Sequence, residues 1–257
     1  MSDVGLLGRQ IGYEQRGYWR NPTAAGFSFA FPIVLLVIFA STGRGSTITS
    51  LGAGKVNFTQ YYIPAIVAFG VMGACFTNLA IFTTFKRDMG ILKRMRGTPL
   101  PAWAYLGGAI GNSIIVSIVL SALVIAVGIV AYNVTFPGHT GALLITLAFG
   151  AATFCALGLA MTTVIPNAEA APAIVNLIFF PLVSISGAFF PVQKGSTLAK
   201  IASVFPLKPF IDATFKAFDP RVRGSGFDVP ALAIITAWGV VGAVVAVRWF
   251  RWEPRRK

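Results

Sequence analysis

Residues able to do acid, base or metal chemistry are few in this chain of 257 residues, which has 8 Asp and Glu residues, 1 His and 2 Cys. Enzymes that work in or at a membrane need such groups clustered near its boundary. Here the acids are scattered, His139 has no neighbouring ligand, and Ser184 and Ser186 have no base nearby in the sequence. The sequence therefore predicts no catalytic residue, no metal site and no cofactor bound by this chain.

The sequence also lacks the motif of a nucleotide-binding loop. Gly54 and Lys55 form the only Gly-Lys pair, but Val56 follows them and the earlier glycine of G-x-x-x-x-G-K-[ST] is missing. Cys75 and Cys155 lie in apolar runs, where a thiol usually behaves as a small hydrophobic group, so we expect no disulfide. Any process that needs energy must draw it from elsewhere.

Composition indicates the solvent in which this chain folds. Hydrophobic residues make up 56% of it and charged residues only 11%, whereas soluble domains carry about 25% charged residues. Long charge-free runs, including one from residue 97 to residue 168, are too apolar for a soluble surface. A charge-free run of that length exceeds one membrane crossing and must fold back on itself, so we predict an all-α integral membrane protein.

Six membrane spans are predicted from these runs. The turn residues between Tyr132 and Gly141 divide the longest run, and Pro181 and Gly187 make the fifth span short or broken. The predicted spans are residues 21–43, 61–85, 105–131, 142–165, 173–190 and 231–247. Together with the segments that connect them, they form a single domain over residues 1–257.

The basic residues predict the orientation. With both termini inside, inner segments hold 13 of the 21 Lys and Arg residues and outer segments hold 8. Lys and Arg are retained on the cytoplasmic side during insertion, so we expect a multi-pass membrane protein with both termini in the cytoplasm. The net charge of +13 is then explained by topology and anionic lipids, and a nucleic-acid partner is not expected, because the charges gather at span ends.

The leader, residues 1–20, has one apolar helical face. Leu7, Ile11, Glu14 and Tyr18 share that face, and the arginines lie off it. This pattern is typical of an amphipathic helix on the cytoplasmic membrane surface. The alternative is a frayed basic tail that only sets topology. No secretory signal peptide is expected, because no small-residue cleavage pattern follows the first apolar run.

Two connectors carry further information. Residues 86–101, KRDMGILKRMRGTPLP, combine five basic residues with Ile91, Leu92 and Met95 before Gly97 and Pro99, which favours a short amphipathic helix. Residues 191–230 contain two stretches with apolar residues at i, i+3, i+4 and i+7, which predict two short helices outside the membrane or re-entrant into it. The alternatives are a basic stop signal for the first connector and a plain surface loop for the second.

These segments resemble the ABC-2 type transporter permeases, the membrane subunits of bacterial ABC exporters. The resemblance rests on the order of residues in 86–101, on SGAFFPVQ at 186–193, on FPLKPFIDA at 205–213 and on Asn21-Pro22 ahead of the first span. In that family the first inner loop contacts the ATPase subunit. The resemblance implies coupling residues at Arg87, Asp88, Gly90, Leu92, Arg94, Met95, Gly97, Thr98 and Pro99.

The resemblance also implies the function and the partners. We expect a non-enzymatic permease subunit, paired with a second copy or a paralogue and with a nucleotide-binding subunit that holds ATP and Mg. Its substrate would be amphipathic or lipid-like, such as a drug, lipid or glycolipid, as in multidrug efflux. The alternatives are an ATP-independent secondary transporter or channel and a membrane-embedded lipid enzyme.

Polar residues inside the spans are candidates for the substrate path. Carriers driven by protons or sodium usually hold ionisable groups in their spans, and none lies inside these six. Hydroxyl and amide groups could line a path, but they also hydrogen-bond between packed helices. The candidate path residues are Thr77, Asn78, Asn112, Ser117, Asn176, Ser184, Ser186 and Phe189.

Overall fold

The computed structural model describes residues 3–43, 47–49, 55–189, 196–219, 221–222 and 224–253. Within these ranges the chain is helical apart from two three-residue strands, which confirms the predicted all-α class. The elements are α1 (Asp3–Trp19), α2 (Pro22–Thr42), β1 (Thr47–Thr49), β2 (Lys55–Asn57), α3 (Phe58–Met72), the π-helix η1 (Gly73–Asn78), α4 (Leu79–Asp88), α5 (Ile91–Arg96), α6 (Ala102–Tyr132), α7 (Thr140–Thr162), α8 (Ala171–Ser186), α9 (Thr197–Val204), α10 (Leu207–Phe218) and α11 (Val229–Trp249).

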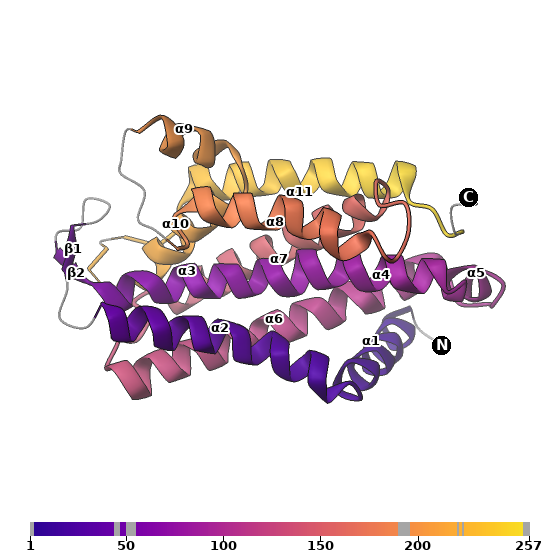
Figure 1. The fold of residues 1–257 in the computed structure, drawn as a ribbon, viewed down its shortest axis with the longest axis horizontal. Coiled ribbons are helices and arrows are strands. Elements are labelled where there is room, and N and C mark those ends of the chain that lie inside the picture. Colours follow the sequence, from indigo (N-terminus) through magenta and orange to yellow (C-terminus); the bar gives the residue numbers. More distant parts are fainter. Residues whose placement is uncertain are drawn as a thin grey trace.

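Long apolar helices run side by side and set the length of the molecule (Figure 1). Five helical segments of the described chain are long and apolar enough to cross a membrane: Ala25–Thr42, Phe58–Asp88, Ala102–Tyr132, Thr140–Thr162 and Val229–Trp249. The second of these is continuous through α3, η1 and α4, and it passes Lys86, where the apolar run ends, to reach Asp88. Helical hydrogen bonding therefore continues beyond the point where hydropathy falls.

α8 is also apolar, but it is shorter than these five segments. It has 16 residues, about 24 Å of helix, against the roughly 30 Å thickness of a bilayer core. Gly187 follows it in the left-handed conformation, with φ of 89°, and ends the helix at Ser186 rather than at residue 190. Residues 190–195, where the fifth predicted span ends and the predicted external segment begins, lie outside the described ranges.

The centre of the bundle is the α3–η1–α4 helix, packed against α2, α6, α7 and α10. In its most apolar 18-residue stretch, 72% of the residues are buried. The corresponding shares are only 17% in α11 and 22% in α2. Nearly every residue of α3 from Tyr61 to Met72 is buried, so its all-round hydrophobicity reflects a core position. The flanking helices α2, α6 and α11 expose apolar side chains outward, as expected for surfaces in contact with lipid or another membrane chain.

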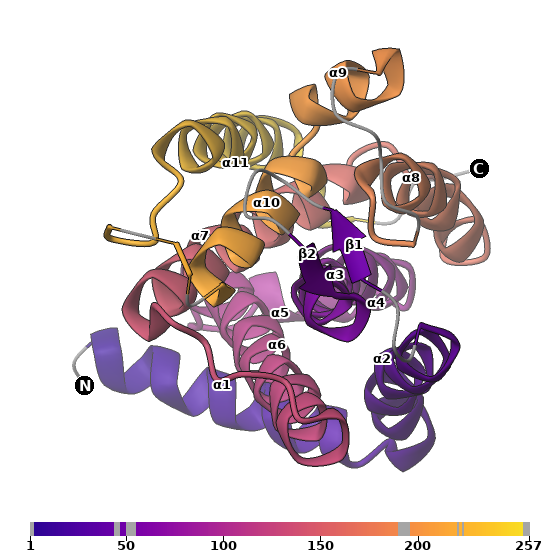
Figure 2. The same cartoon turned by 90° about the vertical axis from the view of Figure 1, so that its left-hand side faces the viewer.

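The two ends of the bundle differ. We call the end formed by α1, α5, residues 163–170 and the C-terminal residues the basic end; it is on the right in Figure 1. The opposite end, with β1, β2 and α10, we call the hairpin end. β1 and β2 pair antiparallel there, with Ile48 opposite Val56, in a connector for which no strand was predicted. Viewed along the bundle, α1 lies across the far end (Figure 2).

Close helix contacts depend on glycines. Gly239 and Gly242 of α11 face Thr153 and Leu157 of α7, and a Cβ atom at Gly242 would lie 2.9 Å from the backbone nitrogen of Leu157. Gly158 of α7 meets the carbonyl oxygens of Cys75 and Phe76 in η1, each 2.9 Å from where its Cβ would be. Small residues let these backbones approach closely, which is the main route to tight helix packing in membranes.

Candidate functional site

The inner connector forms a sharp helical corner at the basic end. Gly90 has a φ of 70°, a conformation that glycine adopts without strain, and it turns the chain from α4 directly into α5. Leu92 of α5 is fully buried and anchors the corner, whereas Lys93, Arg94 and Arg96 are exposed. The predicted short amphipathic helix is therefore present, and its basic face points outward.

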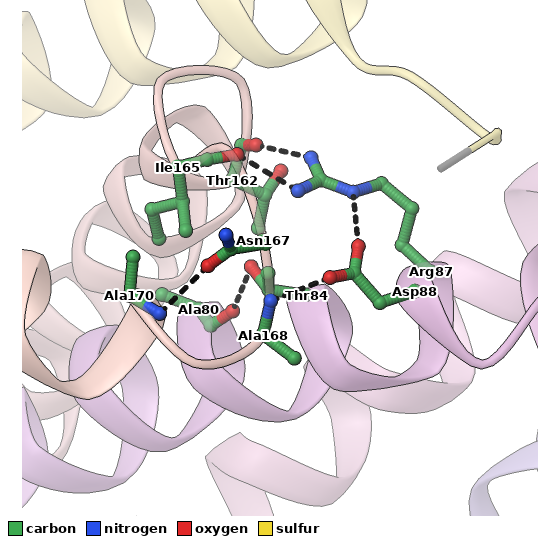
Figure 3. Close-up of polar contacts among 9 residues, drawn as sticks. All are labelled: Ala80, Thr84, Arg87, Asp88, Thr162, Ile165, Asn167, Ala168 and Ala170. Atoms are coloured by element: carbon green, nitrogen blue, oxygen red, sulfur yellow. Dashed lines mark hydrogen bonds and ion pairs between the residues drawn. The ribbon is translucent and has the colours of Figure 1, made fainter. Parts of the chain in front are cut away.

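Arg87 lies inside the fold immediately before this corner. Its side chain is 1% exposed, and its two terminal nitrogens donate to the carbonyl oxygens of Thr162, at 2.6 Å, and Ile165, at 2.8 Å (Figure 3). These are the last carbonyls of α7 and of the turn that follows it, groups that have no helical partner of their own. Arg87 thus joins the end of α4 to the end of α7.

Asp88 completes this junction. One carboxylate oxygen accepts a hydrogen bond from the backbone nitrogen of Ala168, at 2.5 Å, and the other lies 3.6 Å from Nε of Arg87. Asn167 accepts from the backbone nitrogen of Ala170 and stabilises the same turn, just before α8 begins (Figure 3). We call Arg87, Asp88 and residues 162–168 the inner junction. Its charges balance, because a buried cation is paired with an adjacent carboxylate.

α1 is held across the basic end by polar and packing contacts. Nζ of Lys86 donates to both carboxylate oxygens of Glu14, at 2.8 and 2.7 Å. Leu7, Gln10 and Ile11 of α1 lie against Gly107, Gly108 and Gly111 of α6, respectively, each occupying the space where a Cβ atom would be. The glycine-rich start of α6 therefore forms the groove in which α1 lies.

A cavity of about 240 Å³ lies where α1, α4 with η1, and α6 meet. Its polar wall includes Glu14, Tyr18, Asn78, Lys86 and Asn112. Leu79, Phe82, Ala109 and Val116 contribute apolar groups to the remainder. Burial raises the pKa of Tyr18, so its phenol stays protonated throughout the physiological range. We call this the α1 cavity.

The predicted coupling residues separate into outward and inward groups. Arg94, Gly97, Thr98 and Pro99 are exposed at the basic end, whereas Asp88, Gly90 and Met95 are half-buried. Arg87 and Leu92 are buried and cannot contact a docked protein without rearrangement. Their positions instead suit them to hold the corner in place, a role that composition alone did not indicate.

The predicted path residues do not form one continuous surface. Asn78 and Asn112 line the α1 cavity. Ser184 and Ser186 of α8 and Ser117 of α6 donate to carbonyls three or four residues earlier in their own helices, so their hydroxyls are satisfied locally. Asn176 is half-buried on α8, and Thr77 is half-buried in η1. Phe189 packs against Phe39 and Phe69 near the hairpin end.

Three features of the basic end and the adjoining central helix could not be predicted from the sequence. These are the burial of Arg87, the partner of Glu14, and the π-helix between α3 and α4. One signal was present: Lys86 and Arg87 are adjacent at the end of an apolar helix, and adjacent helical positions point about 100° apart, so both cannot face the same surroundings. Within the described ranges no group of three His, Cys, Asp or Glu side chains could hold a metal.

Three of the six basic residues of the outer connector have acidic partners. Lys208 pairs with Asp212, Lys216 with Asp228 at 3.8 Å, and Arg221 with Asp219 at 3.0 Å. Lys194 and Arg223 lie outside the described residues. Burial would raise the pKa of Asp219, but hydrogen bonds from the side chain and backbone of Arg221 outweigh it and lower that pKa. Much of the outer positive charge is therefore neutralised locally.

His139 has a structural position at the hairpin end. Its Nε2 lies 3.0 Å from the carbonyl oxygen of Val222, and its backbone nitrogen donates to Ala217 at the end of α10. Together these contacts fix the turn before α7 to the segment after α10.

Comparison with known proteins adds two findings. The family model described as ABC-2 type transporter matches residues 11–218, which includes the inner junction and the α1 cavity. Two curated relatives, both named probable multidrug ABC transporter permease YbhR, come from Escherichia coli K12 and Escherichia coli O157:H7. Each is 24% identical over 165 residues, covering 62% of this chain and 44% of the relative. The chain thus aligns with less than half the length of these relatives.

Proposed function

Because the chain belongs to the ABC-2 type transporter family, we propose that it is the permease subunit of an exporter whose ATP is hydrolysed by a separate nucleotide-binding subunit. The observation that carries this proposal is the basic end, where exposed residues of α5 and of 97–99 lie directly beside the inner junction. An ATPase docked there would contact a surface rigidly connected to α4, α7 and α8.

The mechanism follows from these connections. Closure of the ATPase subunits pushes on α5, and the corner at Gly90 passes the displacement to α4. Arg87 and Asp88 bind the turn before α8, so α8 moves with α4 instead of independently. Lys86 and Glu14 add α1 to the moving group. ATP can drive this movement only if the permease contacts the ATPase through α5 differently before and after the ATPase subunits close.

The arrangement in the membrane is part of the same proposal. α8 serves as the short fifth of six spans, both termini lie in the cytoplasm, and the membrane is the bacterial inner membrane. Two permease chains, identical or paralogous, form the path between them. The exposed apolar sides of α2, α6 and α11 supply enough surface for both lipid and a second chain. The substrate is amphipathic, in keeping with the multidrug name of the relatives.

The contact with the ATPase has an electrostatic component. Lys93, Arg94 and Arg96 are exposed together on one six-residue helix. A complementary acidic face on the nucleotide-binding subunit would bind faster at low salt, and screening would weaken its association as ionic strength rises.

Co-purification with a nucleotide-binding subunit tests the proposal. The two proteins are co-expressed, purified through a tag on the permease and assayed for ATP hydrolysis in lipid. We expect a stable complex whose recovery falls at least tenfold in Gly97→Trp, because Gly97 is exposed on the docking surface. The matched control is Gly141→Trp at the hairpin end, where a Cβ atom meets nothing within 4 Å.

Two outcomes would overturn the coupling surface or the whole proposal. Equal recovery and ATP hydrolysis in both tryptophan variants would remove the docking role of residues 97–99. Transport of an amphipathic compound that continues after ATP depletion, with no nucleotide-binding subunit bound, would instead support an ATP-independent carrier or channel.

A further inference from the structure

The α1 cavity is a second place in this chain where polar and apolar groups converge. It lies away from the exposed residues of α5, between α1, the η1–α4 segment and the N-terminal half of α6. Its volume of about 240 Å³ is slightly below the range of roughly 300–1,000 Å³ typical of sites that enclose a whole small molecule. It is large enough for a polar head group with the first part of an attached chain.

The polar wall has no net charge. Glu14 and Lys86 are the only ionisable carboxylate and ammonium groups that line it, and they neutralise each other at 2.7 Å. Their side chains are 16% and 30% exposed, so both are largely withdrawn from water. A ligand with a net charge would add an uncompensated charge to this site, which is costly in poorly hydrated surroundings.

Amide and hydroxyl groups supply the remaining polarity. Asn78 of η1 and Asn112 of α6 both line the cavity. The amide oxygen of Asn112 is buried and accepts no hydrogen bond within the described part of the chain. Buried acceptors without a partner are uncommon and costly, so this oxygen favours a ligand that donates a hydrogen bond.

The π-helix η1 contributes to the shape of the site. It provides Ala74 and Asn78 to the wall, and it interrupts an otherwise continuous α-helix of 31 residues at this level. Such single-turn π-helices are frequent at functional sites.

The apolar wall of the cavity extends to the outer surface of the bundle. Phe82 lines the cavity and is also 43% exposed, so it marks where the wall meets the outer surface. Leu79, Ala109 and Val116 continue the apolar lining inward. An acyl chain could leave past Phe82 and remain in contact with the hydrocarbon around the protein.

We propose that the α1 cavity binds the uncharged, hydroxyl-bearing head group of an amphiphile, with its acyl chain leaving past Phe82. The hydroxyl groups donate to Asn112 and exchange hydrogen bonds with Asn78 and the Glu14–Lys86 pair. The site lies within a single chain and needs no ATPase subunit. It therefore stands or fails independently of the proposed coupling surface, and it rests on the proposed function only in placing α1 at a membrane boundary.

Native mass spectrometry of the purified chain tests this site. The protein is kept in an amine oxide detergent, because sugar-based detergents carry the proposed chemistry and would compete. The probes are a monoacylglycerol, the fatty acid of the same chain length and the corresponding alkyltrimethylammonium ion. We expect the monoacylglycerol to bind with at least tenfold higher affinity than either charged probe.

Two variants locate the binding. Ala109→Trp fills the cavity and should reduce monoacylglycerol affinity at least tenfold. Its control, Ala126→Trp, places the same side chain on an exposed part of α6 about 25 Å away and should leave the affinity unchanged. Asn112→Leu keeps the side-chain volume and removes the acceptor, so we expect a loss of about three- to tenfold, with Thr236→Val on α11 as the control for loss of a polar group.

Three results would overturn the proposal: equal affinity for the three probes, equal affinity in the two tryptophan variants, or full affinity in Asn112→Leu. If Ala109→Trp fails to fold, the Asn112→Leu comparison decides by itself. If a probe is retained by every variant alike, it binds the outer apolar surface and not the cavity.

Discussion

Arg87 shows how one side chain can have a role that its sequence context hides. It belongs to a basic cluster and resembles a surface residue of the inner connector, yet it is among the most buried large side chains of the described chain. Two carbonyl oxygens and one carboxylate surround its guanidinium group. A planar guanidinium can bind two carbonyls at once, which an ammonium group does less well.

Replacement of Arg87 should reveal this role as lost stability. Arg87→Met leaves two carbonyl oxygens and the Asp88 carboxylate without their buried partner, and removing one member of a buried charged pair costs about 3–5 kcal/mol. Arg94→Met removes the same side chain from an exposed position of α5 and should change stability by less than about 0.5 kcal/mol. Thermal unfolding of both variants in detergent measures the difference. Similar unfolding temperatures would show that Arg87 has no structural function.

The ion pair of Asp219 at the hairpin end should make the stability of the protein depend on pH. Its pKa is lowered in the folded chain by Arg221, so the folded state binds a proton less readily than the unfolded state. The stability gained is therefore present above the ordinary carboxyl pKa of 3.8 and is lost as pH falls below it. Because Arg221 is 45% exposed, the effect should be less than about 1 kcal/mol.

Unfolding temperatures of the wild type and Asp219→Asn between pH 7 and pH 3 measure this effect. The wild type should be more stable at pH 7, and the two should converge as the pH falls below about 4. A difference that stays constant over this range would mean that the charge of Asp219 contributes nothing.

At the scale of elements, glycines decide which helices touch. α6 begins with Gly107, Gly108 and Gly111 on the face that receives α1, and α7 presents Gly158 to the backbone of η1. Each is a place where a neighbouring side chain or carbonyl fills the position of the missing Cβ. The position of α1 across the bundle is thus set by small residues on another helix, as well as by its own amphipathic pattern.

Replacing one of these glycines with a larger residue should detach α1 from α6. In Gly108→Leu the new side chain overlaps Gln10, so α1 must move away from α6. Limited trypsin digestion of the purified protein should then cleave after Arg9 or Arg16 of α1 at least fivefold faster, because cleavage within a helix requires local unfolding. Gly141→Leu, which meets open space at the start of α7, is the control. Equal cleavage rates in the two variants would contradict the proposed packing of α1.

At the scale of the whole molecule, the two ends are chemically distinct. The basic end combines exposed cations with the inner junction, whereas the hairpin end pairs three of its cations with carboxylates. Lys93 lies 3.8 Å from Glu253 and Lys86 pairs with Glu14, yet the cations of the basic end still outnumber its carboxylates. An excess of positive charge attracts anionic lipid and an acidic partner, which a neutralised pair does only weakly. This asymmetry favours the basic end as the cytoplasmic one.

Cysteine labelling in intact cells measures the orientation. Thr98→Cys at the basic end and Ser203→Cys on α9 are both at exposed positions, and the native Cys75 and Cys155 are buried and should react slowly. A membrane-impermeant maleimide added outside should label Ser203→Cys and leave Thr98→Cys unlabelled until the membrane is opened. The reverse pattern would place the basic end outside and exclude ATPase docking there.

Sequence patterns were sufficient for the parts of this protein that depend on local composition. Long apolar runs predicted the helices, and the order of residues in 86–101 led to the ABC-2 family. The short α5 helix was predicted from basic residues combined with Ile91, Leu92 and Met95 ahead of Gly97. These features are readable because hydropathy and turn preference act over a few neighbouring residues.

Only the tertiary structure decided which polar residues meet. Glu14 and Lys86 are 72 residues apart, Arg87 and Ile165 are 78 apart, and Asn78 and Asn112 both line the α1 cavity. Such pairings depend on which helix faces are brought together by packing, and no periodicity within one helix records its neighbour. Packing also explains why Arg87 is buried while the basic residues beside it point outward. The end of α7 supplies carbonyl acceptors at that one position on the face of α4.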